Sequence, residues 1–133
     1  MKLTNHQINE IVKSINSLVS RVDENGKPIE TAAWFCFYVN LKRLNPLVDD
    51  IMKEQIELFK KYCKIENEQV VFEGQFPVFL SEESKQEYIK NFSQLVSAER
   101  TVDLYQIKAD EIKNEKFDMD TILPLLDTVI ITE

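Results

Sequence analysis

Glycine and histidine are scarce in this chain, and their scarcity excludes several kinds of site. Gly26 and Gly74 are the only two glycines, so a glycine-rich loop that wraps a phosphate group cannot form. His6 is the only histidine, and no cysteine lies near it in the sequence to complete a zinc-binding set. No Gly-x-Ser-x-Gly motif supplies a serine nucleophile. The sequence therefore predicts no catalytic residue, cofactor or metal site, and we expect a protein that is not an enzyme.

Long hydrophobic runs are also missing. No apolar segment approaches the roughly 20 residues that a membrane-spanning helix requires, and residues 1–6 lack the apolar stretch of a signal peptide. The only two cysteines, Cys36 and Cys63, fall near opposite ends of one predicted helix, which favours free thiols over a disulfide. We therefore expect a cytoplasmic location without membrane association.

Basic residues are outnumbered by acidic ones. The chain has 16 lysines and arginines against 23 aspartates and glutamates, which gives a net charge of −7. Such a surface repels the phosphates of nucleic acids and of anionic membranes, so no direct nucleic-acid binding is expected. Solubility is the simplest explanation of the acidity, although a basic partner or mimicry of nucleic acid is compatible with it.

The most prominent pattern that the chain does contain is an apolar seam with a period of seven residues. Its two rows are Trp34, Leu41, Val48, Gln55 and Tyr62, and Phe37, Leu44, Ile51, Leu58 and Ile65. Residues at this spacing share one face of an α-helix. A helix over about 30–64 must therefore be covered by other helices of this chain or of a partner. Pro46 follows Asn45, a good N-cap, which predicts a kink or a restart near 45–46.

The rest of the sequence predicts shorter elements. Thr4 and Gln7 form the capping-box pattern of a helix over about 5–20. A hairpin over about 68–80, a helix over about 82–98, a strand over about 101–107 and a short helix over about 120–127 follow. We expect residues 1–133 to form a single α+β domain. A long kinked central helix, two further main helices, a short C-terminal helix and a small antiparallel β-sheet make up this prediction.

Residues 32–39 are apolar on nearly every side of the predicted helix. A helix of that kind is usually buried all round, which favours core packing for Trp34, Phe35 and Tyr38. An exposed stacking platform for nucleic-acid bases would need a positive groove, and basic residues are sparse here. The alternative position for this segment is an interface with another protein or with a second copy of the chain.

Asp50, Glu54 and Glu57 lie along one face of the same predicted helix. Such a row could bind Mg²⁺ or join a di-metal site. Acid-to-base pairs four residues apart, Asp49 with Lys53 and Glu57 with Lys61, instead indicate a solvated face. The candidate interface comprises the three carboxylates and five residues of the apolar segment: Trp34, Phe35, Phe37, Tyr38 and Leu41.

Several short motifs resemble a family of small proteins from tailed phages and prophages of Gram-positive bacteria. The matching segments are 1–5 (MKLTN), 37–44 (FYVNLKRL), 60–62 (KKY), 99–107 (ERTVDLYQI) and 125–126 (LL). Together they span nearly the whole chain, while Pro46 and the loop 25–28 depart from the family's pattern. No activity is established for that family. The resemblance therefore implies phage origin and expression in the host cytoplasm, and it assigns no functional residue.

We therefore expect a non-enzymatic phage protein that binds another protein, for example an inhibitor of a host or defence factor. The main alternative is a phage structural or assembly accessory protein that acts as a homo-oligomer. A small-ligand or metal binder is the second alternative. In the first two cases the partner is a host protein, a phage protein or a second copy of this chain.

Overall fold

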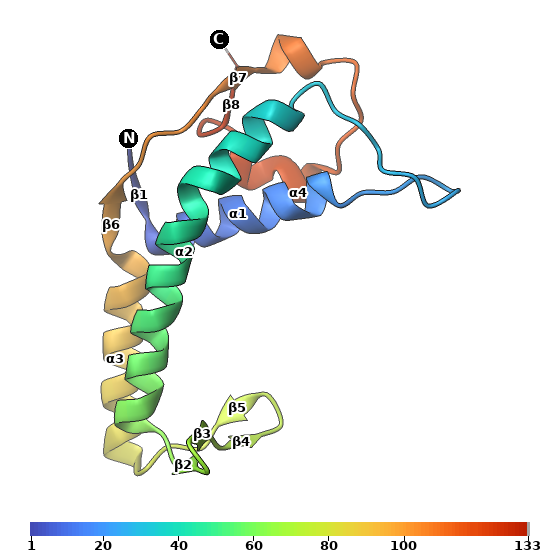
Figure 1. Ribbon diagram of the computed structural model, residues 1–133. Coiled ribbons are helices and arrows are strands. Elements are labelled where there is room, and N and C mark those ends of the chain that lie inside the picture. The colour runs from blue at the N-terminus through green and yellow to red at the C-terminus, as the bar shows by residue number, and fades with distance from the viewer. Residues whose placement is uncertain (133) are drawn as a thin grey trace.

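The computed structural model describes residues 1–132 and has the α+β architecture that the sequence predicted (Figure 1). Three helices dominate: α1 (Asn5–Val19), α2 (Trp34–Tyr62) and α3 (Glu82–Ser97). Among the described residues, no helix is both long enough and apolar enough to span a membrane. The remaining elements are β1 (Lys2–Thr4), β2 (Ile65–Glu66), β3 (Gln69–Val70), β4 (Phe72–Glu73), β5 (Phe76–Pro77), β6 (Glu99–Thr101), β7 (Ile107–Lys108), η1 (Ala109–Ile112), α4 (Met119–Ile122), η2 (Leu123–Leu125) and β8 (Ile130–Ile131).

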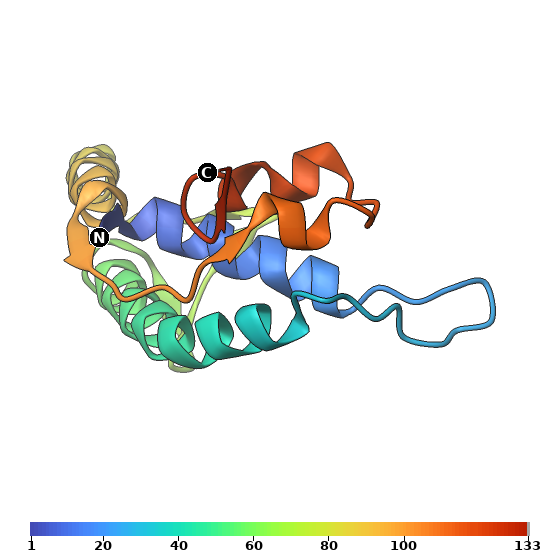
Figure 2. The ribbon, with the colours of Figure 1, turned by 90° about the horizontal axis from the view of Figure 1, so that it is seen from above.

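The molecule consists of a head and an arm (Figure 1). The head comprises β1, α1, the first half of α2 and residues 99–132. The arm comprises the second half of α2, the short strands β2–β5 and α3, which returns alongside α2. Seen from above, α1 lies between the first half of α2 and the C-terminal segment (Figure 2). The long helix therefore belongs to both parts and connects them.

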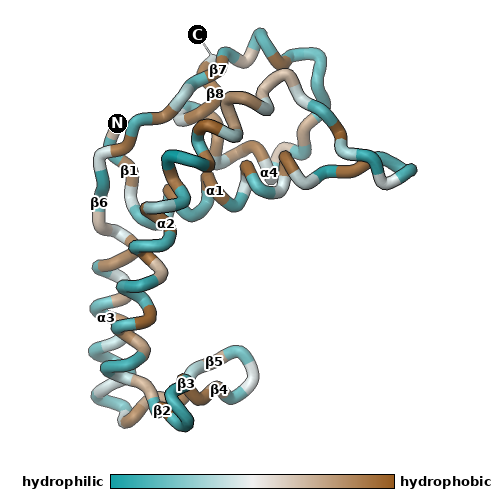
Figure 3. Tube along the Cα trace, in the orientation of Figure 1, coloured by the Kyte–Doolittle hydropathy of each residue, from teal (hydrophilic) through white to brown (hydrophobic). Residues whose placement is uncertain are grey.

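One hydrophobic core fills the head, because α1, α2 and the C-terminal segment each turn an apolar face inward. The largest side chains that are completely buried there are Ile8, Ile11, Ile15, Leu18, Phe37, Leu44, Leu125, Val129 and Ile130. Hydrophobic segments also recur along α2 and α3 down to the tip of the arm (Figure 3). The arm is thinner, however, and among the described residues 82–97 of α3 none is fully buried.

Local signals position the starts of α1 and α3. The Thr4 hydroxyl accepts a hydrogen bond from Gln7 N (3.1 Å), and Gln7 Oε1 accepts one from Thr4 N (2.9 Å), so the predicted capping box is confirmed. Ser81 caps α3 by accepting from Ser84 N at 3.0 Å. Both contacts use residues three apart in the sequence, which is why sequence alone could locate these helix starts.

The helix α2 begins at Trp34, four residues later than predicted, and continues through Pro46 without a restart. Its axis changes direction between the half beside α1 and the half beside α3 (Figure 1). A proline inside a helix removes one hydrogen bond and crowds the preceding turn, which accounts for a bend in an uninterrupted helix. The late start has a tertiary cause, because Ala32 N donates to Glu115 Oε2 at 3.2 Å and keeps this residue outside the helix.

The predicted hairpin over 68–80 is in fact two smaller ladders, Ile65–Val70 and Phe72–Pro77 at their outer pairs. Further main-chain bonds join them into the tip of the arm, where Val71 N donates to Lys64 O and Lys64 N donates to Val78 O. The turn at residues 67 and 68 was not predicted, because two non-glycine residues, Asn67 and Glu68, adopt positive φ there.

The strands differ from the prediction in two further respects. The expected strand over 101–107 is replaced by β6 and β7, with residues 102–106 between them outside any strand. The predicted small antiparallel sheet is instead four two-stranded sheets, of which β7–β8 is parallel and the others are antiparallel. Strand partners come from distant parts of the chain, as in β1 with β6, so local alternation could not identify them.

Polar contacts join the arm to the head at Asn5. Its backbone N–H donates to Ala98 O at 2.9 Å and its side chain donates to Leu95 O at 2.8 Å. Arg100 Nε donates to Asn5 Oδ1 at 2.7 Å, and Arg100 also pairs with Glu54 at 3.3 Å. Since Asn5 is only 1% exposed, this residue fastens α1, the end of α3 and β6 together in a dry setting.

Candidate protein-binding surface

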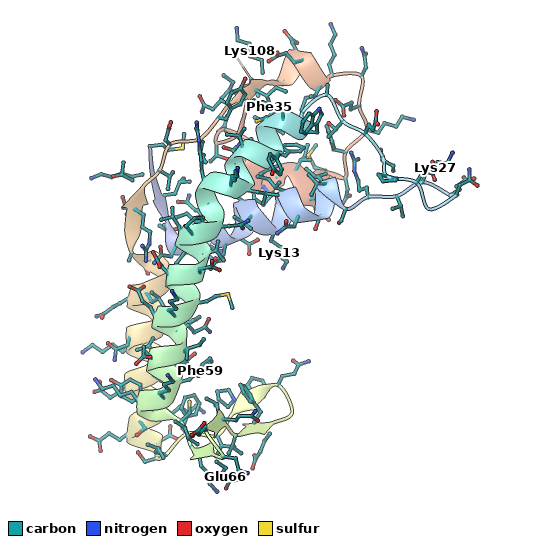
Figure 4. All side chains as sticks on the ribbon, in the orientation of Figure 1. Lys13, Lys27, Phe35, Phe59, Glu66 and Lys108 are labelled. Atoms are coloured by element: carbon teal, nitrogen blue, oxygen red, sulfur yellow. The ribbon has the colours of Figure 1, made fainter. Side chains whose placement is uncertain are left out.

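Four aromatic side chains lie exposed at the N-terminal end of α2 and on the segment that crosses it. Trp34, Phe35 and Tyr38 are 60%, 52% and 54% exposed, and Tyr105 joins them from the C-terminal segment. Phe35 contacts Trp34 and Tyr105 edge to face, at centroid distances of 5.9 and 5.7 Å. We call this group the aromatic surface. Figure 4 shows Phe35 at the outer side of α2, above α1.

The aromatic surface is exposed because the head covers only one side of α2. Cys36, Phe37 and Asn40 face inward and are buried, whereas the residues between them face outward. The prediction that Trp34, Phe35 and Tyr38 pack in the core is therefore wrong. One helix, α1, and the C-terminal segment cover the inner stripe, and no further element of the described chain covers the outer one.

A hydrogen-bonded pair holds the C-terminal segment against α2. Asn40 Oδ1 accepts from Tyr105 N and Asn40 Nδ2 donates to Tyr105 O, both at 2.8 Å. The side-chain amide of Asn40 therefore satisfies the backbone of Tyr105 as a neighbouring β-strand would. Tyr105 O also accepts from Cys36 Sγ at 3.1 Å. These bonds fix Tyr105 beside Phe35 and so assemble the aromatic surface from two distant segments.

The Cys36 thiol is chemically quiet in this environment. Its pKa is raised from 9.0 to about 11, mainly because burial disfavours the thiolate. The hydrogen bond from Asn40 acts in the opposite direction, and the negative charge of Glu111 adds a smaller increase. Cys63 is also buried and free, and burial raises its pKa too. Both cysteines therefore act as buried small residues near neutral pH, without the thiolate that a nucleophile needs.

Two hollows flank Trp34. The first, of about 320 Å³, is lined by Val19 and Ile29 together with Glu30, Thr31 and Trp34. The second, of about 600 Å³, lies towards η1. Its lining residues are Glu30, Thr31, Ala32, Trp34, Glu111, Ile112, Asn114 and Glu115. Trp34 thus stands between an apolar hollow and a polar one.

The structure divides the eight predicted interface residues into three groups. Trp34, Phe35 and Tyr38 form the exposed aromatic surface. Phe37 is 0% exposed and lies in the head core, so its assignment to an interface is wrong. Leu41 is half-buried against the same core. The remaining three residues, Asp50, Glu54 and Glu57, are exposed on the arm.

The structure does not bring the carboxylates of the arm to the aromatic surface. Twelve residues of helix separate Tyr38 from Asp50, which corresponds to about 18 Å. Glu54 pairs with Arg100, and Glu57 pairs with Lys60 at 3.4 Å in place of the predicted Lys61. Residues 1–132 contain no group of three or more histidine, cysteine, aspartate or glutamate side chains that could hold a metal ion.

Sequence reasoning missed Tyr105 and the residues of the two hollows. Tyr105 was assigned to a strand, and only its contact with Asn40 places it beside Phe35. Ile29 and Glu115 lie in loops that carry no periodic signal. A pair of exposed hydrophobic residues in the loop before α2, Val22 and Ile29, was the one available hint of an apolar surface there.

A second apolar area lies on the arm. Phe59, Tyr88 and Phe92 stack at centroid distances of 5.3 and 5.7 Å, which forms the contact between α2 and α3. Burial in this stack raises the pKa of Tyr88. Outside the stack, five hydrophobic side chains remain exposed and are named here the arm surface: Met52, Ile56, Ile65, Phe72 and Phe76.

Comparison of the chain with protein-family models, with curated proteins and with solved structures found no match.

Proposed function

We propose that this chain acts by binding another protein through its aromatic surface, without catalysing a reaction. The observation that carries the proposal is the exposure of Trp34, Phe35 and Tyr38 on one turn of a rigid helix. Tryptophan and tyrosine are the residues that most often dominate binding energy at protein interfaces, where they supply a large area at a small entropic cost. An exposed aromatic group of this size on a well-ordered helix is typical of an interaction site.

The resemblance to phage proteins extends this proposal. If the chain is produced in a bacterial host, a host or defence factor is the partner that such a small acidic protein would inhibit. Its net charge of −7 makes nucleic acid an unfavourable direct target, which leaves protein as the expected class of partner.

The test is affinity capture from extract of a Gram-positive host, followed by size exclusion with light scattering. The variant Trp34→Ser/Tyr38→Ser removes two exposed rings, so the fold is retained while binding is lost. Phe76→Ser is the matched control, because this ring is 76% exposed at the tip of the arm. We expect wild type and control to form a complex heavier than any multiple of the chain mass. Equal capture by all three proteins would contradict the proposal.

A second candidate function is self-association, in which two copies pack through the arm surface as an assembly accessory would. It is favoured by α3, whose residues are all at least partly exposed within the described chain, and by the exposed Met52 and Ile56 on α2. Two helices alone rarely cover each other's apolar faces, and a second pair would complete a four-helix bundle. Sedimentation equilibrium tests it: dimerisation that Ile56→Glu abolishes supports this candidate, and a monomer at high concentration contradicts it.

A further inference from the structure

The groove around Trp34 has an unusual distribution of charge. Eleven of the twelve hollow-lining positions in Figure 4's upper region need no charge argument, so the three that carry one decide the electrostatics: Glu30, Glu111 and Glu115 are the only charged residues that line either hollow. No lysine or arginine lines them. The groove is therefore negative on the side of η1 and apolar on the side of Val19 and Ile29.

These three carboxylates are not neutralised within the protein. Among residues 1–132, none of them forms an ion pair with a lysine or arginine. Glu111 Oε2 accepts from Lys108 N at 3.0 Å and Glu115 Oε2 accepts from Ala32 N at 3.2 Å, and both donors are backbone amides. Glu115 Oε1 is buried and has no hydrogen-bond donor among the described residues. A buried acceptor in that condition favours the arrival of a donor.

The helix dipole acts against a cation here, but it is the weaker influence. The N-terminal end of α2 begins beside the groove and carries about half a positive charge. Three full negative charges outweigh it, and two of them lie on the opposite wall, in and just after η1. The net preference of the groove is therefore for a positively charged group.

Trp34 strengthens that preference. A guanidinium or ammonium group that approaches the three glutamates would also meet the face or edge of the exposed indole, and tryptophan is the best partner for a cation–π contact. The neighbouring hollow offers Val19 and Ile29 to an apolar side chain. A ligand that presents a cation next to an apolar group matches both hollows, whereas an acidic or a purely apolar ligand matches at most one.

We propose that the groove around Trp34 binds a basic peptide segment of a protein partner. An arginine or lysine of that segment lies against Trp34 and the three glutamates, and a large apolar residue next to it fills the hollow at Val19 and Ile29. This inference rests on the proposed protein-binding function and specifies the chemistry of the partner. It gives the acidity of the chain a local role at one site.

The test begins with selection of random dodecapeptides displayed on a carrier against the immobilised full-length chain. We expect the selected peptides to be enriched in arginine and lysine next to large apolar residues. Trp34 is the only tryptophan, so its fluorescence reports binding of a selected peptide directly. The absence of any enrichment in basic residues, or of any peptide that changes the Trp34 signal, would overturn the inference.

Matched variants then separate charge from contact area. Glu30→Gln/Glu111→Gln/Glu115→Gln keeps the size and hydrogen-bonding capacity of the groove and removes its charge. We expect it to weaken the selected peptide about tenfold, since each exposed ion pair contributes a factor of about two to three. Glu68→Gln/Glu73→Gln/Glu83→Gln removes the same charge from exposed positions on the arm and should leave affinity unchanged. Equal affinity of the two triple variants would overturn the proposal.

The two proposals fail in different ways. If Trp34→Ser/Tyr38→Ser abolishes capture of the cellular partner while the groove triple variant does not, the aromatic surface binds a protein but the partner is not basic at this site. If neither variant affects capture, the proposed function itself is wrong. Loss of capture in both variants, together with enrichment of basic peptides, supports both.

Discussion

Asn40 is the residue on which the aromatic surface depends most directly. It is 0% exposed, and its amide makes two hydrogen bonds of 2.8 Å with the backbone of Tyr105. No other side chain among the described residues bonds both the N–H and the C=O of a single distant residue. The position of Tyr105 next to Phe35 therefore follows from one buried amide.

We predict that Asn40→Ala lowers the free energy of unfolding by about 2–3 kcal/mol, because it leaves the Tyr105 N–H and C=O without their partners. Urea denaturation measures the change. Asn45→Ala, an exposed position on the same helix, is the control and should change the free energy by less than about 0.5 kcal/mol. Equal effects of the two substitutions would show that the Asn40 bonds contribute nothing to stability.

The raised pKa of Cys36 makes a prediction about alkaline stability. The unfolded thiol ionises near its ordinary pKa of 9.0, whereas the folded thiol stays protonated until pH approaches about 11. The folded state therefore binds more protons in this window, and its stability falls as pH rises. At pH 10 the loss from this group is about 1 kcal/mol relative to pH 8.

Urea unfolding at pH 8 and pH 10 checks this expectation. We expect Cys36→Ala to lose about 1 kcal/mol less than the wild-type protein between the two pH values, since the variant has no thiol to ionise. Cys63→Ala keeps the Cys36 thiol and should retain that part of the decline. Identical pH dependence of Cys36→Ala and wild type would contradict the raised pKa.

The junction between α1, α3 and β6 decides how the arm is attached to the head. Asn5 is both the first residue of α1 and the acceptor for Arg100, and it also donates to the last turn of α3. A helix start with its own capping box thereby gains a second, tertiary role. The orientation of the arm depends on this junction together with the continuity of α2.

We predict that Asn5→Ala loosens the end of α3, because Leu95 O and Arg100 lose their shared partner. Hydrogen exchange of the amides near Leu95 should accelerate, and the free energy of unfolding should fall by about 1–3 kcal/mol. His6→Ala is the control, since His6 is exposed at the next position. Unchanged exchange at the end of α3 in Asn5→Ala would show that other contacts hold the junction.

The division into head and arm implies unequal stability across the molecule. Nearly all of the fully buried hydrophobic side chains lie in the head, while α3 contacts only one face of α2 along the arm. Helices stabilised by few buried contacts open locally at a lower free energy than core helices. The arm is therefore the part whose stability would gain most from a second copy or a partner.

We predict that backbone amides of α3 exchange through openings of lower free energy than those of α1 in dilute protein. Native-state hydrogen exchange measured by NMR distinguishes the two helices. Raising the protein concentration should leave this difference unchanged for a monomer and should protect α3 if the arm self-associates. Equal protection of α3 and α1 in a verified monomer would contradict the prediction.

Local sequence was sufficient for the fold class, for the long helix and for the starts of α1 and α3. Those features depend on residues three to seven apart, such as Thr4 with Gln7, and this is the range over which helical periodicity and capping act. The scarcity of glycine and histidine likewise limited the chemistry without reference to any fold.

The location of the candidate site depended on contacts between distant segments. An apolar helix such as 34–39 predicts burial, but whether Trp34 is covered depends on how many elements pack around it. Here one helix and the C-terminal segment cover Phe37 and leave Trp34 exposed. The pairing of Asn40 with Tyr105, the grouping of Glu111 with Glu30 and the parallel pairing of β7 with β8 join residues separated by more than twenty positions. Local periodicity carries no information over such separations, because they are set by the packing of the whole chain.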